Sequence, residues 1–501
     1  MIKTLIYNLW SRKNGYKDLL WIAYPLILST SAFTIQVFVD RMFLSWYSPQ
    51  ALAAALPTGV LSFNIVSFFM GTSQYVGTFV AQYVGAKSPE KIGNILWQGI
   101  YFSAIGGVIL ITLSFFSETI FNFIGHDPLV REEQYKYWRF LTIAGIFQIQ
   151  LGALTSFFSG RNKTYPIMWA SFASTFVNIG LNYCLIFGNF GFPEMGISGA
   201  GLSTIVATIT NVTILSYLIF KPKNNTQYHV ISAFHFNRKG FYRLIKFGMP
   251  NGFTFFLNMT VFSIFVLLIG RIGIIELAAT NIAMNVAMLA FMPMVGLGIA
   301  VMVSVGQAIG AKTPDLAKRA TYSGLQISWI YLSFLSIFYI FLPQVLIFPF
   351  ESNASSENFN EIADLTKNIL KLVALWSFFD ALGIMISSGL KGAGDTKFIM
   401  LSVGVIGTFV AAIPVYIVLE IFSMGIYAGF TNGTVFLAVL GFTYLIRFKN
   451  GKWQNMSVIE NLIVKKFETR SSYSFLRFKE AELMQYLKPV GGGPSGKTCP
   501  K

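Results

Sequence analysis

Long apolar stretches alternate with short polar segments along most of this chain. A helix needs about 20 mainly apolar residues to cross the hydrocarbon core of a bilayer. Twelve stretches reach that length, so the pattern predicts twelve transmembrane helices. They cover approximately residues 19–46, 54–81, 93–116, 137–159, 166–188, 197–220, 243–269, 279–306, 321–347, 367–389, 398–419 and 424–446.

The composition supports the same class of protein. Of the 501 residues, 54% are hydrophobic and only 12% are charged, whereas a soluble globular protein carries about 25% charged residues. Such a chain cannot cover a soluble surface, and we expect the lipid bilayer to be its solvent. The two cysteines and three histidines have no disulfide or metal-ligand spacing, so we expect no metal site built from them.

Charge in the connecting segments predicts the orientation. The N-terminus and every second loop are basic, with Arg12, Lys87 and Arg161 as examples, while the opposite loops carry acids such as Glu132 and Glu357. Positively charged loops stay in the cytoplasm, which places both termini there. The net charge of +16 therefore reflects membrane topology, and we expect no nucleic-acid partner.

The chain contains an internal repeat. Residues 51–90 align without a gap on residues 276–315, an offset of 225 that places Gln82 on Gln307, and at the same offset Pro25 falls on Pro250. A second block, 157–168, matches 389–400 with small gaps. Parallel repeats of this kind enclose a central cavity in transporters. We expect a cytoplasmic N-terminus (1–18), an N-lobe (19–220), a cytoplasmic linker (221–242), a C-lobe (243–448) and a cytoplasmic C-terminal extension (449–501).

Four motifs resemble the multidrug and toxic compound extrusion (MATE) transporters. They are "FVDRMFLSWYSPQALAA", "VGAKSPE" with its twin "IGAKTPD", "NIGLNYCLIFGNFGFPEMGISGAGLST" and "DALGIMISSGLKGAGDTKF". The resemblance covers about residues 24–448 and implies an all-α integral membrane protein with two pseudo-symmetric six-helix lobes that form a V. It implies an antiporter that exports small, cationic or amphipathic organic compounds in exchange for H⁺ or Na⁺. We expect a monomer in the bacterial inner membrane, with no cofactor besides the coupling ion.

Two acidic residues lie within the predicted spans, Asp40 in the first and Asp380 in the tenth. A carboxylate at membrane depth is costly and generally belongs to an ion or substrate pathway, although a buried structural carboxylate is the alternative. The resemblance implies that Asp40 is the N-lobe coupling residue. It also implies that Asp380 is a C-lobe cation ligand, as in the NorM-like branch of the family.

The C-lobe departs from that branch at one position. The branch has a glutamate eight residues after the proline of the seventh helix, and here Asn258 follows Pro250 at that spacing. Asparagine offers an oxygen but no charge, and Na⁺ prefers hard oxygen ligands with balancing charge. Na⁺ could bind at Asp380 or at Asp40, but the substitution favours H⁺ coupling through Asp40.

Polar residues surround Asp40 in the predicted N-lobe pocket. Gln36 lies one turn earlier, Asn178 and Asn182 share a face of the fifth helix, and Thr204 opens the sixth. Similar positions line the N-lobe pocket of the archaeal-type branch, although each could make an ordinary interhelical hydrogen bond. Pro25 and Pro250 break the backbone bonding of the first and seventh helices, and we expect hinges there.

Three other functions have weaker support in these residues. The tail sequence GGGPSGKT (491–498) satisfies the phosphate-loop pattern, but no strand precedes it and no helix can follow it, so we expect a dispensable tail. A lipid-linked oligosaccharide flippase would carry basic residues in its cavity, whereas the bases within the predicted spans are Arg41 and a few residues in the first turns of spans, such as Arg139 and Lys371. A membrane-embedded enzyme would need a catalytic cluster at depth, and the sequence offers none.

Overall fold

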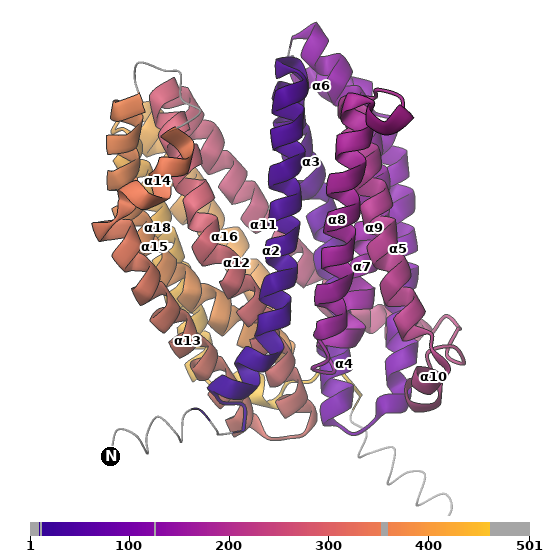
Figure 1. Ribbon diagram of the computed structural model, residues 1–501. Helices are drawn as coiled ribbons and strands as arrows, with labels where there is room; N and C mark the ends of the chain where they lie inside the picture. The colour runs from indigo at the N-terminus through magenta and orange to yellow at the C-terminus, as the bar shows by residue number, and fades with distance from the viewer. Residues whose placement is uncertain (1–9, 11–12, 125–126, 352–358, 461–501) are drawn as a thin grey trace, which may run out of the picture. The chain divides into compact units, whose positions relative to one another are not determined.

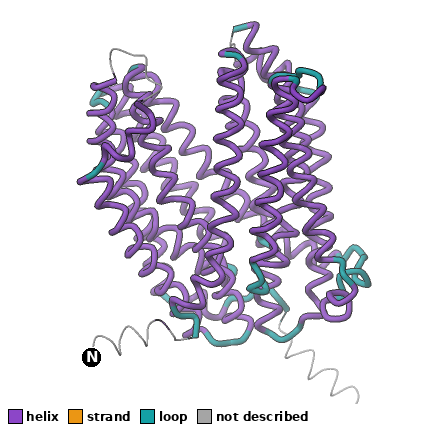
Figure 2. Tube along the Cα trace, viewed as in Figure 1, coloured by secondary structure: helices purple, strands orange, loops and turns teal. Residues whose placement is uncertain are grey.

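A computed structural model describes residue 10 and residues 13–124, 127–351 and 359–460, and its regular structure in these ranges is helical (Figures 1 and 2). Twelve helices or helix pairs within the described residues are long and apolar enough to cross a membrane. Each corresponds to one of the predicted spans. The chain up to Val458 forms one compact unit, and the tail sequence GGGPSGKT lies outside the described residues.

The first six spans are built from seven helices. They are α2 (Tyr16–Tyr47), α3 (Pro49–Gln74) continued by α4 (Val76–Gly85), α5 (Ile92–Ser114), α7 (Pro128–Ser159), α8 (Tyr165–Phe187) and α9 (Ile197–Ile219). A short helix, α6 (Ser117–Ile124), precedes α7. Several of these helices begin with a proline in the first turn, where the missing N–H costs no hydrogen bond.

The last six spans follow in the same order. They are α11 (Arg238–Ile272), α12 (Ile274–Gly310), α13 (Pro314–Phe341), α15 (Phe359–Ala393), the segment from α16 (Thr396–Ile406) through α17 (Ile413–Tyr416) to Ile421, and α18 (Ile426–Lys449). Two π-helical turns, Gly407–Ala412 and Ile417–Ile421, interrupt the eleventh span. A short helix, α14 (Pro343–Glu351), precedes α15.

The two halves contact each other through equivalent helices. In the repeat, α3 corresponds to α12 and α2 corresponds to α11. α3 packs against α11, and α12 packs against α2. A Cβ added to Gly71 would lie 3.0 Å from the Cα of Gly252, and one added to Gly296 would lie 2.9 Å from the backbone nitrogen of Ile27. Glycine at both positions permits this close approach. Both contacts fall two residues after the prolines of α2 and α11, so each proline lies close to the opposite half.

The segment between the halves packs on the first half. It contains the short helix α10 (Pro222–Tyr228), visible beside the lower ends of α5 and α9 in Figure 1. The indole nitrogen of Trp97 donates to the carbonyl of Val230 at 2.7 Å, and the backbone nitrogen of Asn237 donates to the side-chain oxygen of Gln98 at 3.1 Å. The segment is therefore an ordered connection held to α5.

The residues just after α18 also belong to the compact unit. Trp453 is fully buried and stacks on Phe448 with ring centroids 4.6 Å apart. Its indole nitrogen donates to the Phe448 carbonyl at 2.7 Å, and Val458 is 1% exposed. Residues 452–458 are consequently a packed segment, which we call the C-terminal clasp.

Candidate functional site

Asp40 lies in a buried polar cluster between α2 and α8. Its side chain is 8% exposed, and Asn178 and Asn182 are fully buried. The side-chain nitrogen of Asn182 donates both to Oδ1 of Asp40 and to Oδ1 of Asn178, the latter at 3.1 Å. The structure therefore brings together three of the residues that the sequence predicted for this pocket.

The cluster leaves hydrogen-bonding capacity unused. Nδ2 of Asn178 and Oδ1 of Asn182 are buried and have no hydrogen-bond partner among the described residues. Buried polar groups are normally paired, and an unpaired group at a site calls for a ligand, ion or water. The cluster can thus bind a small polar ligand, an ion or a water molecule beside the carboxyl of Asp40.

Two further predicted members are buried but are not joined to Asp40 by a hydrogen bond among the described residues. Gln36 is 6% exposed and lies one turn before Asp40 on α2. Thr204 is 7% exposed, but its hydroxyl donates to the Ala200 carbonyl of its own helix at 3.0 Å. Thr204 therefore contributes an acceptor at most.

Apolar side chains border the Asp40 cluster. A core of buried residues that includes Phe43, Leu44 and Ile186 adjoins it on α2 and α8. Tyr137 of α7 belongs to the same core and is close enough to Asp40 to interact with it electrostatically. The sequence did not single out Tyr137, because a tyrosine at the edge of an apolar run carries no distinctive signal.

Arg41 does not neutralise its neighbour. The side chain of Arg41 is exposed, and no ion pair among the described residues joins it to Asp40. Consecutive residues of a helix point about 100° apart, which explains the separation. In the part of the chain that the structure describes, Asp40 is thus a buried carboxyl that forms no ion pair.

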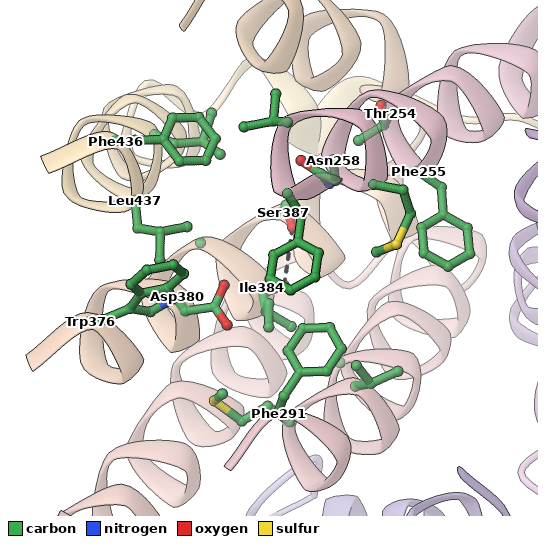
Figure 3. A pocket seen from close by; sticks show the side chains of 18 of the residues that line it. Thr254, Phe255, Asn258, Phe291, Trp376, Asp380, Ile384, Ser387, Phe436 and Leu437 are labelled. Carbon is green, nitrogen blue, oxygen red and sulfur yellow. Dashed lines mark hydrogen bonds between the residues drawn. The ribbon is translucent and has the colours of Figure 1, made fainter. Parts of the chain in front are cut away.

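The second candidate region is a cavity of about 460 Å³ in the second half (Figure 3). Residues of α11, α12, α15 and α18 line it, and most are aromatic, aliphatic or methionine side chains such as Phe255, Met288 and Trp376. Gly71 and Gln74 of α3 also reach it. The volume lies in the range of about 300–1,000 Å³ typical of small-molecule sites.

Asp380 and Asn258 both line this cavity, as the sequence predicted (Figure 3). Asp380 is the single carboxylate among the described lining residues. Within the described residues, no hydrogen bond joins its side chain to that of Asn258. Another amide in the lining, Asn432, donates to the carbonyl of Val410 in the first π-helical turn at 3.0 Å. The cavity therefore offers one negative charge and scattered neutral oxygens.

Lys391 corrects one prediction made from the sequence. The apolar run ends near residue 389, which placed Lys391 in a cytoplasmic loop outside the predicted span. In the structure α15 continues to Ala393, and Lys391 lines the cavity. The argument against a flippase from the lack of an internal base is therefore wrong as stated.

Pro25 and Pro250 are both buried inside their helices, α2 and α11. Neither contributes to the Asp40 cluster or lines the cavity. Their role as hinges stays a prediction.

Most of the chain is similar to known membrane proteins. A model of the MatE family matches residues 25–184 and again residues 250–418. The chain is 26% identical over 447 residues to the probable multidrug resistance protein NorM of Mesorhizobium japonicum, covering 88% of this chain and 95% of that protein. It is 25% identical over 455 residues to the protein of the same description from Thermotoga maritima, covering 90% and 95%.

Solved structures show the same fold. An outward-facing MATE family transporter of the MOP superfamily matches with a TM-score of 0.80 at 18% identity, covering 90% of this chain and 98% of that one. A MOP superfamily transporter from Pyrococcus furiosus matches with a TM-score of 0.79 at 19% identity, with the same coverage. The predicted architecture of twelve transmembrane helices in two six-helix lobes is confirmed.

Proposed function

Because this chain belongs to the MatE family, we propose that it exports small, cationic or amphipathic organic compounds in exchange for H⁺. Proteins of this family are secondary transporters, so the chain is a transporter and not an enzyme. The similarity to multidrug resistance proteins supports efflux as the direction of transport. We place it in the inner membrane of a bacterium, with both termini in the cytoplasm, and expect a monomer to be active.

The observation that carries the proposal is the chemistry of the cavity. Aromatic and methionine side chains offer adaptable apolar contacts, and aromatic faces attract cations. Asp380 supplies one negative charge, and no basic side chain among the described residues forms an ion pair with it. A drug-sized organic cation with an apolar body satisfies all three features.

The coupling ion is proposed to be H⁺, carried by Asp40. Asp40 is buried and forms no ion pair with a base among the described residues, and desolvation favours the neutral, protonated form of such a carboxyl. Na⁺ at Asp380 is the alternative, but Asn258 leaves that position one anion short.

A flippase for lipid-linked oligosaccharides is the second candidate, and Lys391 in the cavity is the observation that favours it. A polyanionic lipid headgroup needs several cations, however, whereas the described cavity lining supplies one lysine among mostly apolar side chains. The lining therefore supports a drug-sized ligand better than a lipid-linked sugar.

The test is transport by the purified protein in proteoliposomes. Vesicles with an imposed pH gradient or an imposed Na⁺ gradient would be offered a panel of fluorescent organic cations. We expect uptake that follows the pH gradient, persists without Na⁺ and disappears when the gradient is collapsed. Uptake driven by Na⁺ alone would contradict H⁺ coupling, and translocation of a labelled polyprenyl lipid instead of any dye would favour the flippase.

A further inference from the structure

The cavity holds a second ionisable group that the proposed function does not use. Lys391 lies near the end of α15 and lines the cavity. Its backbone carbonyl accepts a hydrogen bond from the Tyr75 hydroxyl at 2.8 Å. Within the described ranges, however, its ammonium takes part in no hydrogen bond or ion pair.

Lys391 and Asp380 lie on the same stripe of α15. They are eleven residues apart, which amounts to three helical turns plus about 20° and an axial separation of about 16 Å. The residues between them that line the cavity keep the same spacing, namely Gly383, Ile384, Ser387 and Ser388. One wall of the cavity thus carries a carboxylate at one level and an ammonium about three turns away.

The ammonium lies at the end where the two halves meet. Tyr75, which holds the Lys391 carbonyl, stands between α3 and α4 of the first half. The next residue, Gly392, accepts a hydrogen bond at its carbonyl from Gln82 of α4 at 3.0 Å. These two contacts fix the end of α15 and therefore the level at which the Lys391 side chain enters the cavity.

An unpaired charge that lines an apolar cavity needs a partner. Ionisable residues within membrane spans are costly, and they generally pair with one another or mark a substrate path. Asp380 is too far along the helix to be the partner of Lys391, and it is the single carboxylate in the described lining. A bound molecule with an acidic group would supply the anion that the described lining lacks.

We propose that Lys391 binds an acidic group of the transported compound, so that the preferred substrates are zwitterionic amphipaths. The cationic group of such a molecule lies near Asp380, its carboxylate near Lys391, and its apolar body against side chains such as Phe291 and Met294. This inference rests on the proposed function, since it names the substrate class of the same cavity. A simple monocation leaves the ammonium unpaired and binds less tightly.

The experiment compares two fluorescent dyes that differ only at one group, an amphipathic amine with a free carboxylate and its methyl ester. Equilibrium binding to the full-length purified protein is measured by fluorescence polarisation, and transport is measured in proteoliposomes. We expect the wild-type protein to bind the acid about tenfold more tightly than the ester, equivalent to one ionic contact. Lys391→Gln should weaken acid binding about tenfold and leave ester binding nearly unchanged, and Lys391→Arg should retain the preference for the acid.

The matched control is Lys397→Gln, which removes a positive charge from α16 outside the cavity lining and should alter neither dye's binding. Equal affinity of the wild-type protein for acid and ester would overturn the inference, and that measurement needs no variant to fold. Equal loss of both dyes in Lys391→Gln would also overturn it. Failure of the proposed function is distinct, because it would show as no gradient-driven uptake of either dye while the binding preference is still measured.

Discussion

Gln82 and Gln307 stand at equivalent positions of the two repeats, and each donates its side-chain amide to a backbone carbonyl of the opposite half. Gln82 donates to Gly392 at 3.0 Å, and Gln307 donates to Gly160 at 2.9 Å. Gly160 and Gly392 are themselves equivalent in the second block of the repeat. The internal duplication is therefore preserved in the contacts that join the halves near the ends of α4, α12 and α15.

The side-chain oxygens of the two glutamines accept hydrogen bonds from different groups. The side-chain nitrogen of Asn162 donates to Oε1 of Gln307 at 3.0 Å. Gly394 occupies the position of Asn162 in the second repeat and has no side chain. In the second repeat the C-terminal clasp supplies the donors instead. The Ser457 hydroxyl and the Val458 backbone nitrogen donate to Oε1 of Gln82 at 3.0 and 2.9 Å.

Replacing the two glutamines should loosen this junction. In Gln82→Leu and Gln307→Leu a carbonyl of the opposite half loses its donor, which costs about 1–3 kcal/mol when the group stays buried. A loss of this size shifts the equilibrium between the two halves in contact and the two halves separated at this junction by roughly five- to 150-fold. A cysteine placed at the buried Thr78, in a background without Cys184 and Cys499, should then react faster with an impermeant maleimide.

The control for this measurement is Gln344→Leu, a change of the same chemistry at an exposed position, which should leave labelling unchanged. Equal labelling of Thr78→Cys in all backgrounds would mean that the glutamines do not hold the junction.

The extent of the functional chain can be tested by truncation. Ending the chain after Val458 keeps the clasp and should leave thermal stability in detergent and transport unchanged. Ending it after Lys452 removes the buried Trp453 and the donors to Gln82, and should destabilise the protein by about 3–5 kcal/mol, as expected for loss of a large core side chain. Differential scanning fluorimetry of the two truncated proteins measures the difference.

The same pair of truncations tests the phosphate-loop pattern. We expect no ATP binding by the full chain and no ATP dependence of transport. Transport that required ATP and vanished in the protein ending at Val458 would contradict a dispensable tail.

Individual residues show how much of the structure could be predicted from the sequence. The twelve helices could be predicted because length and apolarity alone decide whether a segment can span a bilayer. The meeting of Asp40 with Asn178 and Asn182 could be predicted because two asparagines four residues apart share one helix face, and the resemblance supplied the pairing of helices. Nothing in a single sequence, however, showed which of these side chains would be left with unpaired atoms.

Lys391 and the clasp escaped prediction for a physical reason. The apolar run of the tenth span stops at the lysine, but the helix continues because protein, rather than lipid, surrounds its last turn. A Cβ on Gly392 would lie 2.4 Å from the Met302 carbonyl, which shows how closely that turn is packed. The clasp likewise depends on contacts with Gln82, in a helix far earlier in the chain, and such contacts leave no local pattern.

The ionic preference of the cavity should depend on Asn258. Asn258→Glu adds a second anion to the lining that holds Asp380, and Na⁺ prefers such a pair of oxygen anions. We expect this variant to acquire Na⁺-stimulated transport, which dye uptake at fixed pH with increasing Na⁺ would reveal. Asn258→Gln lengthens the same side chain without adding charge and should not respond to Na⁺.

Loss of Asp380 should be milder than loss of Asp40. In Asp380→Asn we expect substrate affinity to fall roughly tenfold, corresponding to about 1.4 kcal/mol, with pH-driven transport still present. Complete loss of transport in Asp380→Asn, together with no Na⁺ response in Asn258→Glu, would contradict the separation of roles between the two halves.

Asp40 itself provides the most direct test of coupling. Asp40→Asn keeps the size of the side chain and can still hydrogen-bond with Asn182, but it cannot release a proton, so it imitates the protonated state permanently. Because the side chain is buried against amide groups and forms no ion pair with the exposed Arg41, the substitution breaks no ion pair among the described residues, and we expect the variant to fold normally. Transport against a gradient should fall by about 100-fold or more, the scale of a lost proton-transfer group, while dye bound in the cavity at Asp380 should retain its affinity.

Asp18→Asn, at the exposed start of α2, is the control and should transport normally. If Asp40→Asn pumps dye at the wild-type rate and with the wild-type dependence on the imposed pH gradient, the carboxyl is structural and the proton must travel through the other half.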